Sequence, residues 1–234
     1  MSAADAAIAV IAKSPVPGRV KTRMQPALDP TESADLARRL LLDAIDQAAG
    51  TGADVWCSYA GPPQPLRALL PDLPLLKQRG ADLAERLLAT QEDLFAVGYT
   101  SVILFGGDCP TVGTAPLRKA LAMLRRDPSR AVLGPAADGG YTLLATAKPT
   151  PHLFDGVEMS TDRVLRDTLD RAARAGTPVT LLDVRHDLDT ASDLVAALRA
   201  GQLDAAPRTR VVAERLTAVS RTACPRADAG IQSV

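Results

Sequence analysis

The chain of 234 residues carries 27 lysines and arginines and 27 aspartates and glutamates, so its formal net charge is zero. This balance argues against binding to bulk nucleic acid or to an anionic membrane surface, because both need a basic excess. No apolar run approaches the roughly 18 residues that span a bilayer. Three cysteines without a C-x-x-C pair argue against a disulfide framework or a structural zinc site. We therefore expect a cytoplasmic protein that acts on small molecules. Whether it forms a homo-oligomer is left open by the sequence.

The first half of the chain alternates apolar runs with amphipathic segments. Continuous apolar runs are typical of strands buried on both faces, and apolar spacing of three to four residues is typical of helices. The predicted elements are a strand at Ala7–Ala12, a helix capped by Asp29 and opened by Pro30, a strand at Asp54–Ala60, a short strand within 73–78, and a helix at Asp82–Val97 closed by Gly98.

The second half continues the alternation. The predicted elements are a strand within 101–108, a helix at Thr114–Arg126, strands at 130–135 and 141–147 joined by a turn, a helix at Thr161–Ala175, a strand at 178–184, and a helix at Thr190–Arg199. This order predicts an α/β fold with a mainly parallel central sheet and helices on both faces. We expect residues 1–200 to form one domain, and 201–234 to add a C-terminal helix and a disordered tail.

Chemically distinctive side chains follow four of the predicted strands. In open α/β sheets, ligands bind beyond the carboxyl ends of the strands. The basic segment Lys13–Arg23 follows the first strand, whereas later strands lead into Asp108, Asp138 and the acidic segment Asp183–Asp189. One basic loop and three acidic loops are therefore expected to converge on one edge of the sheet.

The basic loop holds four cationic side chains beside one glycine and two prolines. Such a loop suits a polyphosphate, because glycine lets the backbone approach and the cations neutralise charge. It is neither a P-loop nor a dinucleotide fingerprint, since both glycine patterns are missing. A solvated surface loop is the alternative.

Asp108 follows a buried strand and two glycines, a position suited to holding Mg²⁺ or Mn²⁺. It could instead cap the next helix or form an Asx-turn before Pro110. Asp187 and Asp189 could add ligands to such a metal, although Asp189 could equally cap the helix at Thr190. The segment 138–140 reads first as a hairpin turn, and a functional role would need its glycine amides to face a ligand.

Five motifs, in order across residues 7–199, resemble a bacterial family grouped with the GT-A glycosyltransferases as nucleotide-diphospho-sugar transferases, some of them linked to arsenosugar biosynthesis. The matching elements are K-x-P-x-P-G-x-V-K-T-R at 13–23, "QRGADLAERL" at 78–87, G-x-D-C-P at 106–110, G-P-x-x-D-G-G-Y at 134–141, and D-x-D-T-x-x-D-L at 187–194. The chain is similar, more distantly, to 2-phospholactate and molybdenum cofactor guanylyltransferases. The resemblance implies a Rossmann-like GT-A or nucleotidyltransferase fold.

Combined with this resemblance, the residues receive candidate roles. The nucleotide and its phosphates are assigned to Lys13, Gly18, Lys21, Thr22, Arg23 and Gly107, with Asp82 and Arg86 near the base or ribose by resemblance only. The metal is assigned to Asp108, Asp187 and Asp189. The acceptor is assigned to Gly139, Gly140, Ser160 and Thr161. The catalytic groups are assigned as Asp108, Lys21 and, as base, Asp138.

Three functions remain open. The first is a Mg²⁺- or Mn²⁺-dependent glycosyltransferase that moves a sugar from a nucleoside-diphosphate sugar to a small acceptor. The second is a nucleotidyltransferase that joins a nucleoside triphosphate to a phosphorylated or carboxylated metabolite and releases pyrophosphate, with Lys21 and Arg23 stabilising the triphosphate. The third is a nucleotide-binding domain without catalysis, motivated by Met159, where the family usually has tryptophan, and by Ala145, where it usually has glycine.

Overall fold

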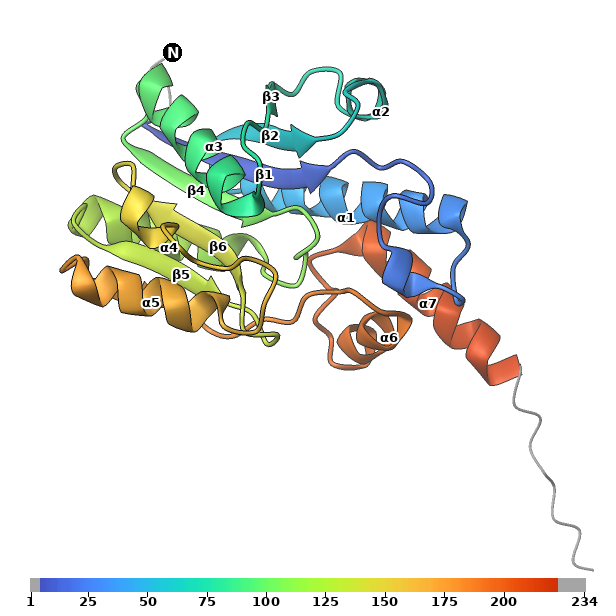
Figure 1. Ribbon diagram of the computed structural model, residues 1–234. Coiled ribbons are helices and arrows are strands. Elements are labelled where there is room, and N and C mark those ends of the chain that lie inside the picture. The colour runs from blue at the N-terminus through green and yellow to red at the C-terminus, as the bar shows by residue number, and fades with distance from the viewer. Residues whose placement is uncertain (1–4, 223–234) are drawn as a thin grey trace, which may run out of the picture.

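The central feature of the fold is one seven-stranded sheet, seen in a computed structural model that describes residues 5–222 (Figure 1). The strand order is β3-β2-β1-β4-β6-β5-β7. The strands are β1 (Ala6–Lys13), β2 (Asp54–Ala60), β3 (Leu75–Lys77), β4 (Ser101–Gly106), β5 (Ala131–Pro135), β6 (Tyr141–Thr146) and β7 (Val179–Leu181). Only β6 runs antiparallel to its neighbours among these strands. The predicted α/β fold with a mainly parallel sheet is confirmed.

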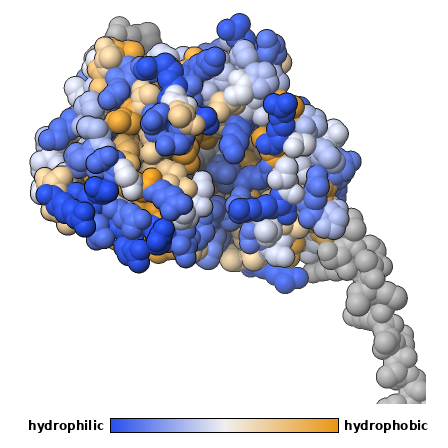
Figure 2. Space-filling model, viewed as in Figure 1, coloured by the Kyte–Doolittle hydropathy of each residue, from blue (hydrophilic) through white to orange (hydrophobic). Residues whose placement is uncertain are grey.

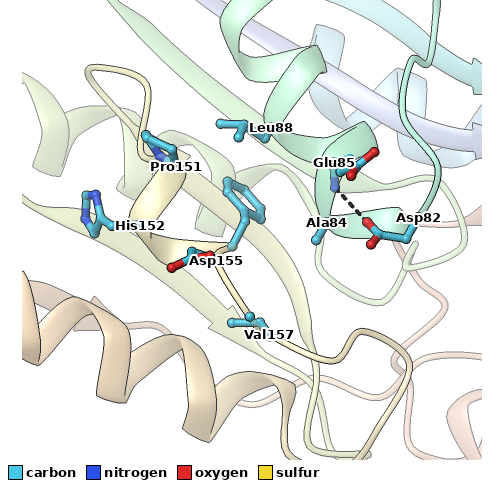
Figure 3. A pocket seen from close by; sticks show the side chains of 10 residues that line it. Asp82, Ala84, Glu85, Leu88, Pro151, His152, Asp155 and Val157 are labelled. Carbon is cyan, nitrogen blue, oxygen red and sulfur yellow. Dashed lines mark hydrogen bonds between the residues drawn. The ribbon is translucent and has the colours of Figure 1, made fainter.

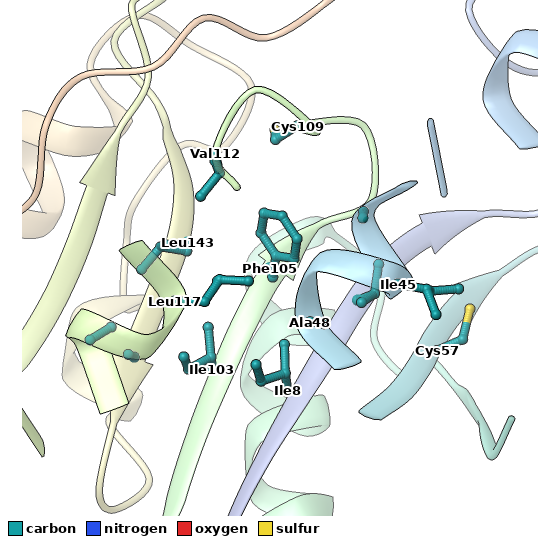
Figure 4. Close-up of a cluster of buried hydrophobic side chains, with 14 of the residues drawn as sticks. Ile8, Ile45, Ala48, Cys57, Ile103, Phe105, Cys109, Val112, Leu117 and Leu143 are labelled. Atoms are coloured by element: carbon teal, nitrogen blue, oxygen red, sulfur yellow. The ribbon is translucent and has the colours of Figure 1, made fainter. Parts of the chain in front are cut away.

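Helices cover both faces of the sheet and bury a separate apolar layer on each. The helices α1 (Pro30–Ala49) and α4 (Thr114–Arg126) pack on one face, where aliphatic side chains surround Phe105 (Figure 4). The helices α3 (Leu83–Val97) and α5 (Val164–Arg174) pack on the other face, over a second apolar cluster. Burial on both faces explains why the strands read as continuous apolar runs.

Local signals in the sequence fix where most helices begin. Asp29 and Glu32 form a capping box at α1, and the Asp82 side chain accepts a hydrogen bond from the amide of Glu85 at the start of α3. The helix α6 (Ala191–Arg199) is capped by Thr190 together with Asp193. Each cap satisfies amides that have no partner inside the helix. The predicted starts of these three helices hold to within one residue.

Two short helices and one boundary differ from the predictions. The helix α2 (Gln64–Leu69) and the 3-10 helix η2 (Pro151–Leu153) have prolines at their first turns, and neither was predicted as a helix. A further 3-10 turn, η1 (Thr22–Met24), lies in the basic loop. The helix α5 begins three residues later than predicted, because residues 161–163 form a bend and a turn after Ser160, whose backbone is left-handed with φ 65°.

A last helix, α7 (Pro207–Thr222), packs against α1 and α6. Its apolar side chains share a third cluster with those of α1 and α6, and Leu203 and Ala206 of the preceding turn are buried in it. The disordered tail that we expected at the end of residues 201–234 lies outside the described residues.

A buried carboxylate ties α7 to α1. The side chain of Asp43 has 0% exposure and accepts hydrogen bonds from the amide and guanidinium of Arg208 and from the amide and hydroxyl of Thr209. These bonds satisfy the first amides of α7 and place a negative charge at the positive end of its dipole.

We predict that Asp43→Ala lowers the free energy of unfolding by about 2–4 kcal/mol, because it leaves these donors without a partner in a buried position. Urea unfolding followed by circular dichroism measures the change. Asp46→Ala is the matched control, since Asp46 contacts Arg208 from an exposed position and its loss should cost at most about 1 kcal/mol. Equal losses in both variants would contradict this role of Asp43.

Candidate functional site

The side chain of Lys21 joins three loops at the carboxyl edge of the sheet. Its ammonium nitrogen donates hydrogen bonds to Asp108 Oδ2 at 3.1 Å, to Asp189 Oδ1 at 2.9 Å and to the carbonyl oxygen of Leu188 at 2.9 Å. These partners follow β4 and β7, whereas Lys21 follows β1. The expected meeting of the basic loop with two of the acidic loops therefore takes place at one ammonium group.

The charges of Lys21 and Asp108 keep each other ionised. The Lys21 side chain is only 9% exposed, while Asp108 is 52% exposed. Burial alone would lower the pKa of Lys21, but the charges of Asp108 and Asp189 outweigh it, so the pKa is raised. The neighbouring ammonium in turn lowers the pKa of Asp108. Both groups are consequently charged at neutral pH.

The loop that carries Asp108 is held by its glycines and by one buried glutamine. A Cβ at Gly107 would lie 2.9 Å from the carbonyl oxygen of Ile11, so only glycine allows this approach to β1. The Gly107 amide donates to that same carbonyl. Gln47, on α1, donates to the carbonyl of Pro110 and accepts from the amide of Gly113. The carboxylate of Asp108 is thus presented from a fixed loop.

The negative charge of Asp138 acts on Asp187 at the same edge. Burial raises the pKa of Asp187 to about 6, with a further contribution from the negative charge of Asp138 and smaller ones from Asp189 and Asp108. A raised pKa with these causes shows that the four carboxylates share one electrostatic environment. Groups with such shifts gather at functional sites, although structural clusters produce them too.

The rest of the basic loop presents cations to solvent. Arg23 is 78% exposed and reaches Asp189 at 3.2 Å. Lys13 and Arg19 are exposed and have no ion pair within residues 5–222. Gly18 supplies a left-handed turn with φ 75°, and Thr22 opens the short helix η1. The loop therefore combines the buried and paired Lys21 with the exposed Arg23, which has one carboxylate partner, and with Lys13 and Arg19, which have none within the described residues.

Asp82 and Arg86 both shape the entry to α3. Asp82 caps the helix, and Arg86 donates to the carbonyl oxygens of Gly80 and Ala81 at 3.1 and 3.2 Å. These contacts account for both residues without a ligand. Their assignment to a base or ribose stays a prediction.

The residues assigned to the acceptor lie in two loops that touch. A Cβ at Gly139 would lie 2.0 Å from the carbonyl oxygen of Asp162, which makes glycine obligatory there. The amides of Gly139 and Gly140 donate within the hairpin turn, to Ala136 and Asp138. The hydroxyl of Thr161 is bonded to the carbonyl of Glu158. The hairpin is confirmed as a turn, and its glycine amides do not meet the condition for facing a ligand.

Ser160 is exposed beside this contact, with a left-handed backbone. Of the two departures from the family pattern, Ala145 is fully buried in the layer under α1 and α4, whereas Met159 packs at the edge of the opposite layer. Only Met159 therefore lies near the loops assigned to an acceptor.

Some contributors gave no signal in the sequence. Gln47 sits in mid-helix, and Leu188 acts through a backbone carbonyl, so neither residue type points to its role. Arg185 pairs its backbone with Pro135 and Ala137, while its buried Nε has no partner within residues 5–222. An arginine inside an acidic segment is expected to be solvated, so the sequence gives no reason to expect a buried guanidinium nitrogen here.

The carboxylates at this edge have the chemistry that a hard divalent cation needs, but they are not gathered around one point. Asp108, Asp187 and Asp189 offer the oxygen ligands that Mg²⁺ and Mn²⁺ prefer, and their mutual repulsion at Asp187 favours a cation among them. In the part of the chain that the structure describes, no three acidic, histidine or cysteine side chains converge closely enough to hold an ion. Lys21 occupies the position between two of them.

A bacterial family model described as "Uncharacterized protein conserved in bacteria (DUF2064)" matches residues 41–161. The chain belongs to this family. No functionally curated protein matches the chain.

Solved structures add the fold. A protein of Desulfovibrio desulfuricans G20, provisionally named a nucleotide-diphospho-sugar transferase, is 30% identical, with a TM-score of 0.86 over 94% of this chain and 98% of that chain. CMP:2-keto-3-deoxy-manno-octonic acid synthetase in complex with CTP is 17% identical, with a TM-score of 0.55 over 85% and 99%. Rv0371c of Mycobacterium tuberculosis H37Rv in complex with manganese is 20% identical, with a TM-score of 0.52 over 83% and 98%.

These similarities confirm the predicted Rossmann-like fold shared by nucleotide-sugar transferases and nucleotidyltransferases. At such identities the last two structures speak to the fold alone. Within residues 5–222, no helix is both long enough and apolar enough to cross a membrane.

We predict that Asp187→Asn stabilises the metal-free protein at pH 7.5. A carboxyl whose pKa is raised by folding favours its neutral form, so its stabilising contribution is present at low pH and is lost as the pH rises through about 6. After allowance for partial exposure, the gain is about 1 kcal/mol, or about 2–4 °C in Tm.

Thermal unfolding in the presence of a chelator, at pH 4 and pH 7.5, measures this difference. It should shrink towards pH 4, and Asp183→Asn, an exposed acid in the same segment, should show no such trend. A variant that is less stable than the wild type at pH 7.5 would contradict the electrostatic account of Asp187.

Proposed function

We propose that this protein is a metal-dependent transferase that uses a nucleoside-diphosphate sugar as donor and a small molecule as acceptor. The contact of Lys21 with Asp108 and Asp189 carries the proposal, because it brings the basic loop and two of the acidic loops to one point. The edge of the sheet where they meet is where ligands bind in open α/β folds. The similarity to the provisionally named sugar transferase supports the donor class.

The basic loop would bind the phosphates of the donor. Lys13, Arg19 and Arg23 are exposed and can neutralise a diphosphate, while Gly18 and Thr22 shape the turn that presents them. Lys21, already held between two carboxylates, would position the acidic residues and supply a fixed positive charge beside the leaving group. Asp82 and Arg86 would border the base or ribose, and Gly107 would keep the Asp108 loop close to β1.

Asp108, Asp187 and Asp189 would hold Mg²⁺ or Mn²⁺, and the manganese complex of Rv0371c supports testing Mn²⁺ first. When bound, the ion would supply charge neutralisation for the diphosphate leaving group. Gly139, Gly140, Ser160 and Thr161 would border the acceptor. Asp138, whose charge is felt at Asp187, would accept the proton from an acceptor hydroxyl.

One observation favours a second function, transfer of a nucleotidyl group from a nucleoside triphosphate. Two cations of the basic loop, Lys13 and Arg19, have no carboxylate partner within the described residues, which suits a third phosphate. The fold shared with the CTP-bound synthetase is compatible with this chemistry. The choice between the two functions is therefore a choice of donor.

We predict that one class of nucleotide, with Mn²⁺ or Mg²⁺, raises the Tm of the protein by about 5–10 °C when present at about 100 times its Kd. The screen compares nucleoside-diphosphate sugars with nucleoside triphosphates. Stabilisation by a sugar nucleotide supports glycosyl transfer, and stabilisation by a triphosphate alone supports nucleotidyl transfer. The absence of any metal-dependent shift would overturn both.

Asp108→Ala should abolish the metal-dependent part of this shift, because it removes a ligand and one partner of Lys21. The shift, and not the starting Tm, is compared, since the variant also changes stability without ligand. Asp170→Ala, an exposed acid on α5, is the matched control and should keep the full shift.

We further predict that Lys13→Ala and Arg23→Ala each weaken binding of the stabilising nucleotide about 5–10-fold at low salt, because each removes one cation from the phosphate loop. Isothermal titration at 20 mM and 300 mM salt measures the change, which should shrink at high salt as exposed charges are screened. Lys119→Ala, on the outer side of α4, should leave the affinity unchanged. Unchanged affinity in all three variants would show that the basic loop does not bind the phosphates of the nucleotide.

A further inference from the structure

A pocket of about 550 Å³ opens between the first turn of α3 and the segment that follows η2 (Figure 3). Its lining comes from two parts of the chain that are roughly 70 residues apart. None of the roles assigned so far uses it, except that Asp82 stands at its border. Its volume is within the range of sites that bind small organic molecules.

The floor of the pocket is apolar. Ala84 and Leu88 form the side that belongs to α3, while Phe154 and Val157 form the opposite side. Phe154 and Val157 are buried, and Phe154 belongs to the apolar cluster between the sheet and α3 and α5, so this wall is preformed. Figure 2 shows apolar side chains at the surface between α3 and α5, among polar ones. A ligand would gain from placing an apolar body here.

The rim of the pocket is negatively charged. Asp82, Glu85 and Asp155 border it, and no lysine or arginine is among its lining residues. Asp82 and Glu85 accept hydrogen bonds from backbone amides, which leaves their charge in place. Asp155 is 81% exposed and forms an ion pair with Arg171 at 3.8 Å, which neutralises part of its charge. An anionic ligand would meet three carboxylates, whereas an ammonium group or hydroxyls would find acceptors.

The pocket adjoins the site at the carboxyl edge. The helix α3 leads back into β4, so its first turn lies at the same edge as Asp108 (Figure 1). The opposite wall continues from Val157 to the Asp162 carbonyl that packs on Gly139. The pocket is therefore bounded on one side by the element assigned to the base or ribose, and its other wall ends at Val157, three residues before Ser160 of the loop assigned to the acceptor.

We propose that this pocket binds the acceptor, and that the acceptor is a small molecule with an apolar body and hydroxyl or ammonium groups but no net negative charge. The proposal rests on the proposed function and adds the chemical class of the second substrate. It disfavours the phosphorylated or carboxylated acceptors that the nucleotidyltransferase alternative would use, because three carboxylates border the rim and the one arginine beside it, Arg171, is already paired with Asp155.

Three matched probes test the ligand class: cyclohexylmethylamine, cyclohexylmethanol and cyclohexanecarboxylate share one ring and differ in charge. Ligand-observed NMR titrations give the Kd values, and the amide shifts of Ala84 and Gly156 report the location. We expect the amine to bind at least about 10-fold more tightly than the carboxylate, with the alcohol between them. Equal affinity of amine and carboxylate, or shifts confined to other residues, would overturn the proposal.

Two variants sharpen the result. Asp155→Lys places a cation on the rim at an exposed position and should reduce the preference for the amine about 10-fold, whereas Asp170→Lys on α5 should not change it. Leu88→Trp should fill the pocket and weaken all three probes. If this variant is misfolded by circular dichroism, the comparison of the two lysine variants decides alone.

The role as acceptor site is tested by adding the nucleotide that stabilises the protein in the thermal screen. Donor and acceptor must be bound together, so the amine should bind equally well or more tightly with the nucleotide present. Displacement of the amine by the nucleotide would assign the pocket to the donor and overturn the acceptor role. If no nucleotide binds, the acceptor role falls with the proposed function, while the probe titrations still decide the ligand class.

Discussion

An ammonium group that leaves water must find acceptors for its three protons, and at Lys21 these acceptors belong to two other loops. The nearly buried nitrogen contacts Asp108, Asp189 and the Leu188 carbonyl at 2.9–3.1 Å. If any one partner moved, a charge would be left poorly solvated, which is far more costly than losing an exposed ion pair. The loops after β1, β4 and β7 are therefore fixed relative to one another by one side chain, and the geometry of the candidate site follows from this constraint.

The apolar layers on the two faces of the sheet keep the three loops close enough for Lys21 to reach its partners. They hold the carboxyl ends of β1 and β4 in register, so the loops leave the sheet from neighbouring positions. Gly107 then packs directly on β1, and Gln47 ties the same loop to α1. Burial and the negative charge of Asp138 raise the pKa of Asp187, and a cation beside these carboxylates would offset that charge. Rigid packing thus supports a site whose charges are not fully balanced internally.

The sequence predicted the sheet, most helix boundaries and the convergence of charged loops, because these features have local signals. Capping residues mark α1 and α3, and a glycine pair before Asp108 marks a loop at the end of a buried strand. Asp189 was ambiguous between a cap and a ligand, and the structure decides against the cap, since Thr190 fulfils that role. The helix α2 was missed because its prolines open a helix and a turn equally well. Gln47 and the Leu188 carbonyl were missed because a buried amide and a backbone carbonyl carry no sequence pattern.

The pocket beside α3 lay beyond sequence analysis for another reason, since its walls come from segments that only the fold brings together. The rim of the pocket is negatively charged, whereas the basic loop is positively charged. This difference bears on where each substrate can bind. A site that receives an anionic donor on free cations and a second substrate beside carboxylates separates the two by charge, because each substrate is repelled from the other's half. Such a separation would prevent a second nucleotide from occupying the acceptor half, and it favours transfer of a sugar to a neutral or cationic acceptor over the joining of two anions.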